Sequence, residues 1–437
     1  MHLSLDASER RVVATARVLA VAALVVSLAA CDSPRPVGFP DAWRSDAGTD
    51  EDASEPRDAG LDGAPEDAPA GDDAYVVPGM CEFDAATDFF ELDYDLRSDV
   101  RRLAVAAGPT SFAVVFSKHD VDDHEDLYFV EIPASGGPPL TTQQLTFDAT
   151  PDASPVIART SEGWLVAWLS GRDGNVEVYA WGRSASGWAA VPQRITSTPT
   201  IDETTVALAS DGARTAIAWA EPGASPVTVA LPVDAAGGAT AGPVRLSPAS
   251  VAMIPTSFTT TEDGYLVGWV GPSGDALVQP LSGALATLGD PLVLTAGHDA
   301  DGTIDAVVSS SGGAAVYGVH PATGRHDVHA HQLGSDGALF HIEQPLTFGD
   351  DTGSDAAIAI LGGGYVVGYR QSGIEPMLRV LFYDAIFGER LRADLVRMSA
   401  TGGPISARVS GDGNVLLTWS DLVGSVNHMR VARLRCP

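Results

Sequence analysis

Glu162-Gly-Trp-Leu-Val-Ala-Trp168 is the clearest copy of a pattern that recurs along most of this 437-residue chain: a short apolar run that ends in an aromatic residue. Such runs end at Phe116, Trp168, Trp219, Trp269, Tyr317, Tyr369 and Trp419, at intervals of 52, 51, 50, 48, 52 and 50 residues. So regular a spacing indicates internal repeats of about fifty residues. Because each aromatic residue ends an apolar run, we expect these rings to pack between repeats.

A second marker has the same period. A Leu, Ile or Met followed by Thr or Ser occurs at Leu145-Thr146, Ile195-Thr196, Leu246-Ser247, Leu294-Thr295, Leu346-Thr347 and Met398-Ser399. In the second repeat, four strand-like segments, residues 155–159, 164–168, 176–181 and 193–196, are joined by turns that contain Gly or Asp. Four short strands per repeat, without a helical period, are typical of a β-propeller blade.

The length of the repeat region predicts the number of blades. Residues 81–437 number 357, and 357/7 is 51. We therefore predict an all-β fold in residues 78–437: a single β-propeller with seven four-stranded blades. Six or eight blades remain alternatives, because weak terminal repeats are easily miscounted.

The ends of the repeat region predict how the ring closes. The last repeat supplies three strand segments, near residues 405–409, 415–419 and 429–435. The missing fourth strand is expected in residues 91–96, because an N-terminal strand added to the last blade removes two open edges. This topology places Cys81 beside Cys436 and predicts a disulfide between them, which an exported protein can form; the signal for export is described below. Two free thiols are the alternative.

The second repeat resembles the TolB-type propeller repeat. In that family a Leu-Thr is followed by a Ser-Pro-Asp-Gly turn, an apolar strand, Ser-Asp-Arg-Asp-Gly and Ile-Tyr. The matching residues here are Leu145-Thr146, Ser154-Pro155, the apolar run quoted above, Gly171-Arg-Asp-Gly174 and Val178-Tyr179. The resemblance implies a fold used by many exported bacterial lipoproteins, and it implies no particular activity.

Residues 1–30 predict an export signal. Arg10, Arg11 and Arg17 precede an apolar segment, residues 18–30, which is shorter than the roughly 20 residues of a transmembrane helix. Leu28-Ala-Ala-Cys31 resembles the lipobox of bacterial lipoproteins. The resemblance implies that Cys31 becomes the first residue and carries a lipid anchor, which locates the protein in the cell envelope, at the outer membrane or cell surface rather than the inner membrane. An ordinary secretory signal or a short membrane span is the alternative.

Residues 31–77 predict an acidic, disordered tether. Residues 32–77 contain 13 acidic and three basic residues among Pro, Ala and Gly, so the segment cannot bury enough apolar surface to fold. The whole chain has 26 basic and 57 acidic residues, a net charge of −31. This charge argues against nucleic-acid binding, which needs clustered positive charge.

Candidate sites for chemistry are few. The sequence contains no Gly-x-Ser-x-Gly, His-Glu-x-x-His, phosphate-loop or dinucleotide-binding motif, so no cofactor is expected to be required. Asp299, Asp301 and Asp305, spaced around Gly302 in an expected loop, are the best candidate ligands for Ca²⁺; an ordinary acidic turn is the alternative. His329 and His331, two apart on an expected strand, could begin a Zn²⁺ site, although a solvated strand is the more common outcome.

Three carboxylates share one position in their repeats. Asp152, Glu203 and Asp301 each lie 16 residues before the aromatic residue of their repeat, so we expect them at equal heights near the mouth of the central channel. There they would bind a cation or a basic ligand, or remain separate solvated charges. The sequence favours a non-catalytic platform that binds a protein or an envelope glycan. The alternatives are an enzyme acting on an extracellular polysaccharide and a purely structural envelope component.

Overall fold

The computed structural model describes residues 81–95, 103–119, 124–198, 200–223, 226–246, 254–295, 299–320, 326–340, 343–347, 352–373, 376–399 and 402–436. All of them belong to one compact unit, Ala70–Pro437. Residues 1–80, with the predicted signal, Cys31 and the tether, lie outside the described residues, so the predictions for them stay predictions.

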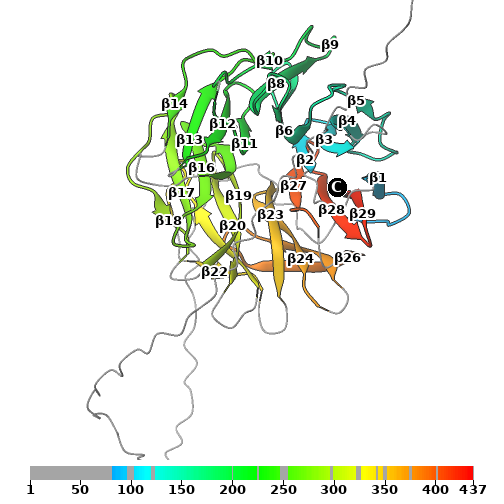
Figure 1. Ribbon diagram of the computed structural model, residues 1–437. Coiled ribbons are helices and arrows are strands. Elements are labelled where there is room, and N and C mark those ends of the chain that lie inside the picture. The colour runs from blue at the N-terminus through cyan, green and yellow to red at the C-terminus, as the bar shows by residue number, and fades with distance from the viewer. Residues whose placement is uncertain are drawn as a thin grey trace, which may run out of the picture. The chain divides into compact units, whose positions relative to one another are not determined.

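Seven antiparallel sheets form a β-propeller, as the sequence predicted (Figure 1). The first three blades are β2(Leu103–Ala107), β3(Ser111–His119), β4(Glu125–Pro133) and β5(Gln143–Gln144); β6(Asp152–Arg159), β7(Gly163–Ser170), β8(Glu177–Ser184) and β10(Gln193–Arg194), with β9(Gly187–Trp188) paired to β8; and β11(Val206–Ser210), β12(Thr215–Glu221), β13(Val227–Pro232) and β14(Val244–Arg245).

The fourth, fifth and sixth blades repeat this order. They are β15(Pro255–Thr260), β16(Gly264–Val270), β17(Ala276–Ser282) and β18(Leu292–Val293); β19(Asp299–Ser309), β20(Gly312–His320), β21(Asp327–Leu333) and β22(Gln344–Pro345); and β23(Gly353–Leu361), β24(Gly364–Gln371), β25(Met377–Tyr383) and β26(Glu389–Arg397). Among the described residues there is no helix, and so none that could cross a membrane.

The seventh blade is built from both ends of the domain. Its sheet contains β27(Ser406–Val409), β28(Val415–Val423), β29(Val426–Leu434) and, as the outermost strand, β1(Phe89–Asp95). The register of β1 against β29 runs from Phe89 opposite Ala432 to Asp95 opposite Asn427. The predicted closure of the ring by an N-terminal strand is therefore confirmed.

The predicted disulfide is also confirmed. Cys81 and Cys436 are bonded across 355 residues of sequence; Cys81 lies eight residues before β1, and Cys436 lies two residues after β29. A buried ion pair lies beside the bond: Arg433 in β29 donates from Nε and Nη2 to Oδ1 of Asp88 at 3.1 and 2.9 Å. The guanidinium also donates to the backbone oxygen of Thr87. Covalent and ionic contacts thus join the two ends at one place.

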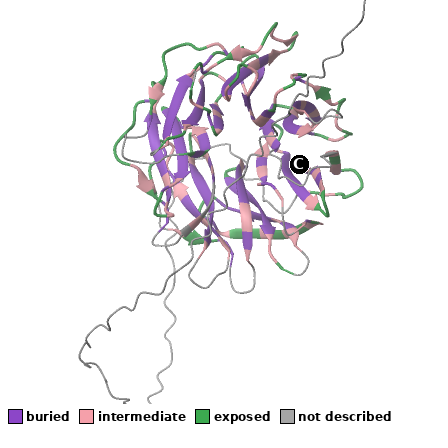
Figure 2. Ribbon diagram, viewed as in Figure 1, coloured by how far each residue is buried: buried purple, intermediate pink, exposed green. Residues whose placement is uncertain are grey.

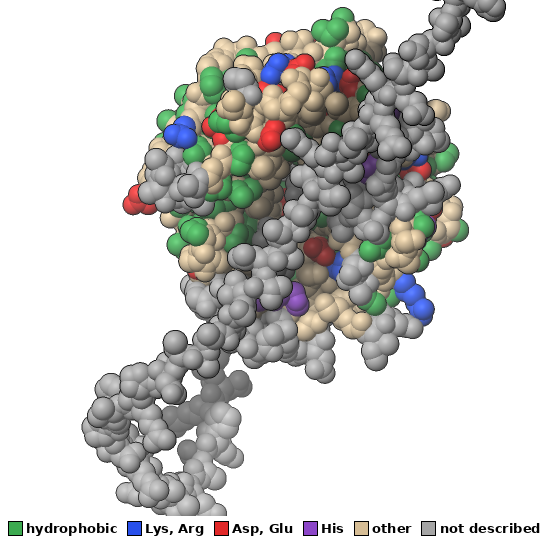
Figure 3. Space-filling model, viewed as in Figure 1, with side chains coloured by type: hydrophobic (Ala, Val, Ile, Leu, Met, Phe, Trp, Pro, Cys, Tyr) green, Lys and Arg blue, Asp and Glu red, His purple; other side chains and the backbone are tan. Residues whose placement is uncertain are grey.

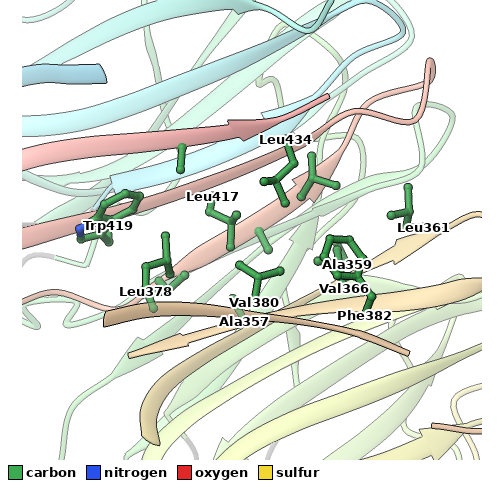
Figure 4. Close-up of a cluster of buried hydrophobic side chains, with 14 of the residues drawn as sticks. Ala357, Ala359, Leu361, Val366, Leu378, Val380, Phe382, Leu417, Trp419 and Leu434 are labelled. Carbon is green, nitrogen blue, oxygen red and sulfur yellow. The ribbon is translucent and has the colours of Figure 1, made fainter. Parts of the chain in front are cut away.

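The hydrophobic core lies between the blades. The buried apolar residues form seven clusters, each containing side chains from two neighbouring blades, and one of them joins blade 7 to blade 1. Figure 4 shows the cluster between blades 6 and 7, where Trp419 and Leu417 face Leu378 and Val380. Buried residues accordingly follow the strands, while exposed residues concentrate in the connections (Figure 2).

The repeated aromatic residues occupy this core. Phe116, Trp168, Trp269, Tyr317, Tyr369 and Trp419 are all fully buried, and Trp219 is nearly so. The prediction that they pack between the blades is confirmed. Because each blade packs on its two neighbours, the chain forms one domain without a single large core.

Candidate functional site

A central cavity runs between the innermost strands of all seven blades. Its volume is about 590 Å³, within the range of small-molecule sites. We name the four strands of a blade A to D from this channel outward. The wall consists mainly of small and apolar residues of the A strands, such as Ala106, Ala158 and Ala209.

Three charged side chains line the cavity among the residues that the structure describes: Arg159, Asp305 and Arg408. Asp305 Oδ2 accepts a hydrogen bond of 3.0 Å from the backbone N–H of Ile358 and lies 3.7 Å from Nη1 of Arg408. Burial raises the pKa of Asp305, and the charge of Arg408 opposes that shift. The Arg159 guanidinium lies over the ring of Trp164, 5.1 Å from its centroid.

Asp152 lies inside blade 2 and is fully buried. Its Oδ1 accepts a hydrogen bond of 3.1 Å from Nε1 of Trp168, and Nη2 of Arg172 lies 3.2 and 3.0 Å from its two oxygens. Asp152 does not line the central cavity. Its carboxylate is held by groups of its own blade.

Glu203, at the equivalent position of the next repeat, has a different environment. Its Oε1 accepts a hydrogen bond from Thr198 Oγ1 at 2.9 Å, but Oε2 is buried without a partner among the described residues. In the same blade, Nε1 of Trp219 and Oγ1 of Thr205 are likewise buried without partners among the described residues. Burial raises the pKa of Glu203 to about 7; the hydrogen bond from Thr198 opposes this shift, and the Glu177 carboxylate adds to it.

Glu203→Gln is expected to stabilise the protein above neutral pH. A carboxyl group with a folded pKa of about 7, against an ordinary value of 4.5, makes the folded state bind the proton more tightly. The free energy of unfolding of the wild type should therefore fall as the pH rises from about 4.5 to about 7, by roughly 2–3 kcal/mol. The glutamine variant should lack this loss. Urea unfolding at pH 5 and pH 8, with the exposed Glu162→Gln as control, measures the difference; parallel pH profiles for wild type and Glu203→Gln would contradict it.

The proposed calcium loop is mostly strand. Asp299 begins β19 opposite His320, and the register is irregular between Ala300 and Ile304. The side chains of Asp299 and Asp301 lie outside the described residues, so their convergence with Asp305 stays a prediction, as does that of Asp301 with Asp152 and Glu203. Within the described part of the chain, no three His, Cys, Asp or Glu side chains form a group that could hold a metal ion.

The two strand histidines face the same aromatic ring. The rings of His329 and His331 lie 6.3 and 6.2 Å from that of Tyr317. His329 Nδ1 lies 2.8 Å from Oε1 of Glu343, and His331 Nε2 lies 2.6 Å from the backbone oxygen of Leu294. Both side chains thus take part in the packing of blade 5.

Exposed apolar side chains concentrate in one class of connection. The connections between the C and D strands of five blades each expose one: Leu140 at 56%, Val191 at 60%, Leu288 at 51%, Phe340 at 70% and Ile386 at 72%. Because the blades share one strand order around the ring, their C–D connections leave the sheets at the same face of the propeller, which we call the C–D face. Phe147, in a D-to-A connection, marks the opposite face.

A groove of about 400 Å³ lies on the C–D face between blades 5 and 6. Phe340 and Ile386 contribute to its wall, together with the turn Ser309–Gly312 and Gln332. The groove lining that the structure describes contains no charged side chain. This is unusual on a chain with a net charge of −31; elsewhere, as Figure 3 shows for one face, acidic and basic side chains are scattered among hydrophobic and neutral ones.

The sequence interpretation missed these exposed residues, although a signal was present. Leu288 and Phe340 each lie six residues before the Leu of their Leu-Thr marker, and Leu140 lies five before its own. The channel arginines carry no such signal, because repeat position alone does not say which way a side chain points.

No family model matches the chain, and neither does any curated protein. Among solved structures, it is similar to Raptor from Chaetomium thermophilum, with 10% identity and a TM-score of 0.45, over 80% of this chain and 30% of Raptor. The chain thus spans about a third of the length of that protein.

Two further similar structures are matched over nearly their whole length. The WD40 domain of SCAP from fission yeast is 8% identical, with a TM-score of 0.41, over 80% of this chain and 98% of that domain. An α-L-arabinofuranosidase from Fusarium graminearum is 10% identical, with a TM-score of 0.45, over 79% and 97%. At these values the likeness says nothing of function, and the β-propeller assignment rests on the strand order described above.

Proposed function

We propose that this protein is a non-catalytic binding platform that docks a partner protein against its C–D face. The observation that carries the proposal is the exposed apolar side chain in the C–D connections of five blades. Exposed apolar side chains that line one groove, as Phe340 and Ile386 do, are typical of protein interaction sites, whereas single ones are common on any protein surface. The aromatic and aliphatic pair Phe340 and Ile386 suits the centre of such an interface.

The chemistry of the groove favours a protein over an acidic or cationic ligand. Its described lining offers apolar side chains, serine hydroxyls and backbone groups, and no counter-charge. A partner that presents one or two apolar side chains is the occupant that matches this surface. The enzyme alternative finds less support, because both oxygens of Asp152 are engaged by Arg172.

The cellular setting is proposed from the sequence. We propose a lipoprotein with TolB-type repeats, anchored through Cys31, with the acidic segment 31–77 as its tether. The partner is then a protein of the same envelope compartment.

One double substitution and one single control substitution test the docking face. Phe340→Ser with Ile386→Ser removes the apolar wall of the groove, whereas Phe147→Ser removes an equally exposed apolar side chain from the opposite face. In affinity purification from envelope extracts with quantitative mass spectrometry, a partner recovered with the wild type and Phe147→Ser should fall at least tenfold with the groove variant. Equal recovery with the groove variant would contradict the proposal.

A further inference from the structure

The central channel is a second cavity, lined by other residues than the groove on the C–D face. We propose that it binds a small organic carboxylate with an apolar body, its carboxylate held by Arg408 and Arg159. This inference stands on the channel alone and does not depend on the proposed docking of a partner.

The first observation is the excess of positive charge in the channel. Its described lining contains two arginines and one aspartate, within a chain whose net charge is −31. Arginine guanidinium groups bind carboxylates with paired, charge-assisted hydrogen bonds. An anion is therefore attracted to this lining more than to most of the protein.

The second observation is that both guanidinium groups keep donors available. In the described part of the chain, Arg408 makes one hydrogen bond, from Nη1 to the backbone oxygen of Ala407 at 2.6 Å, besides its contact of 3.7 Å with Asp305. Its Nε and Nη2 face no protein acceptor there, and its side chain is 39% exposed. Arg159 makes no hydrogen bond to a described residue and lies over the Trp164 ring.

The third observation is that the two arginines lie toward the same end of the channel. Arg159 is the last residue of β6, and Arg408 is the next-to-last residue of β27. Both strands are innermost in their blades, and the A strands of a propeller run in the same direction. Asp305 lies further from this end, since β19 continues to Ser309.

The uncharged residues of the channel wall indicate what the body of the ligand, beyond its carboxylate, is made of. Seven serine and threonine residues, Ser257 and Thr259 among them, lie between the alanine, valine, leucine, isoleucine, proline and phenylalanine residues of the described lining. The apolar part of this wall gains free energy by covering an apolar body. A carboxylate on a short aliphatic or aromatic body matches both parts of the site.

Calorimetric titration of the full chain with hexanoate tests the proposal, with hexylamine and hexanol as the cationic and neutral probes. We expect one hexanoate per chain and no detectable binding of the other two. Arg408→Gln should weaken hexanoate binding at least tenfold and Arg159→Gln at least threefold. Arg245→Gln, which removes an exposed arginine outside the channel, should leave binding unchanged.

Asp305→Asn is expected to strengthen hexanoate binding, whereas the arginine substitutions weaken it. It removes a negative charge 3.7 Å from Arg408 and releases that guanidinium, so hexanoate should bind at least threefold more tightly. Thermal unfolding of each unliganded variant checks that it is folded. The proposal is overturned if hexanoate does not bind, if Arg408→Gln binds it as well as the wild type, or if hexylamine binds more tightly. None of these results bears on the C–D face, whose variants lie outside the channel.

Discussion

Replacing both Cys81 and Cys436 with serine is expected to lower the free energy of unfolding by about 5 kcal/mol. The disulfide closes a loop of 355 residues, and in the chain-entropy model so long a closed loop restricts the unfolded chain strongly. It also holds β1 in the seventh blade, so its loss should open the ring first at that blade. Guanidinium chloride unfolding under oxidising conditions measures the change.

Reduction provides the matched control for this prediction. Dithiothreitol should destabilise the wild type by the same amount as the double substitution and should leave the double variant unchanged. If reduction does not alter the unfolding midpoint of the wild type, the disulfide contributes nothing to closure. Two alkylatable thiols in the oxidised protein would contradict the bond itself.

Asp88→Asn is expected to cost about 4 kcal/mol, because it leaves the Arg433 guanidinium buried without its counter-charge. Asp88 is fully buried and Arg433 is 1% exposed, so solvent cannot replace the lost partner. Urea unfolding measures the effect, with the exposed Asp290→Asn as control. If Asp88→Asn lowers the free energy of unfolding by less than about 1 kcal/mol, the usual contribution of a surface ion pair, then Asp88 and Arg433 do not form a buried ion pair.

The ion pair of Asp88 also predicts how the free energy of unfolding depends on pH. Burial acts to raise the pKa of Asp88, but the backbone N–H of Asp84 and the guanidinium groups of Arg433 and Arg435 outweigh it, so the pKa lies below its ordinary value of 3.8. The stabilisation by Asp88 is therefore fully present above about pH 4 and is lost as the pH falls through the lowered value. The difference in stability between wild type and Asp88→Asn should shrink in acid; a difference independent of pH would contradict the ion pair.

The architecture was predictable because a propeller repeats one unit. Each blade must present an apolar face to both neighbours, so the same aromatic position recurs at Trp168, Trp269 and Trp419 and is buried each time. The count of repeats then predicted seven blades, and the three-stranded last repeat predicted closure by an N-terminal strand. Closure in turn predicted the Cys81–Cys436 bond.

The candidate sites were less predictable, because a repeat position gives the height of a residue and not its partners. Asp152 and Glu203 share one offset in their repeats. The residue 20 positions after Asp152 is Arg172, which neutralises it, whereas the residue 20 positions after Glu203 is Gly223. One carboxylate is therefore paired, while the other is buried with one oxygen that has no partner among the described residues.

The contact between Asp305 and Arg408 in the channel could not be predicted from the sequence either. The residues next to Asp305 in the sequence predict that it is a calcium ligand. In the structure it contacts Ile358 of the next blade and Arg408 of the blade after that, residues 53 and 103 positions away. Contacts of this kind depend on the radial arrangement of the blades, which the local pattern around Asp305 does not contain.

The most direct test of the central claim, a binding platform that uses its C–D face, is photo-crosslinking in cells that produce the full chain. A photoreactive phenylalanine analogue is placed at Phe340 in one variant and at Phe147 in the other. One discrete crosslinked partner is expected from position 340 and none from position 147. A partner captured from position 147 and not from 340, or none from position 340 in cells where the protein is well recovered, would contradict the claim.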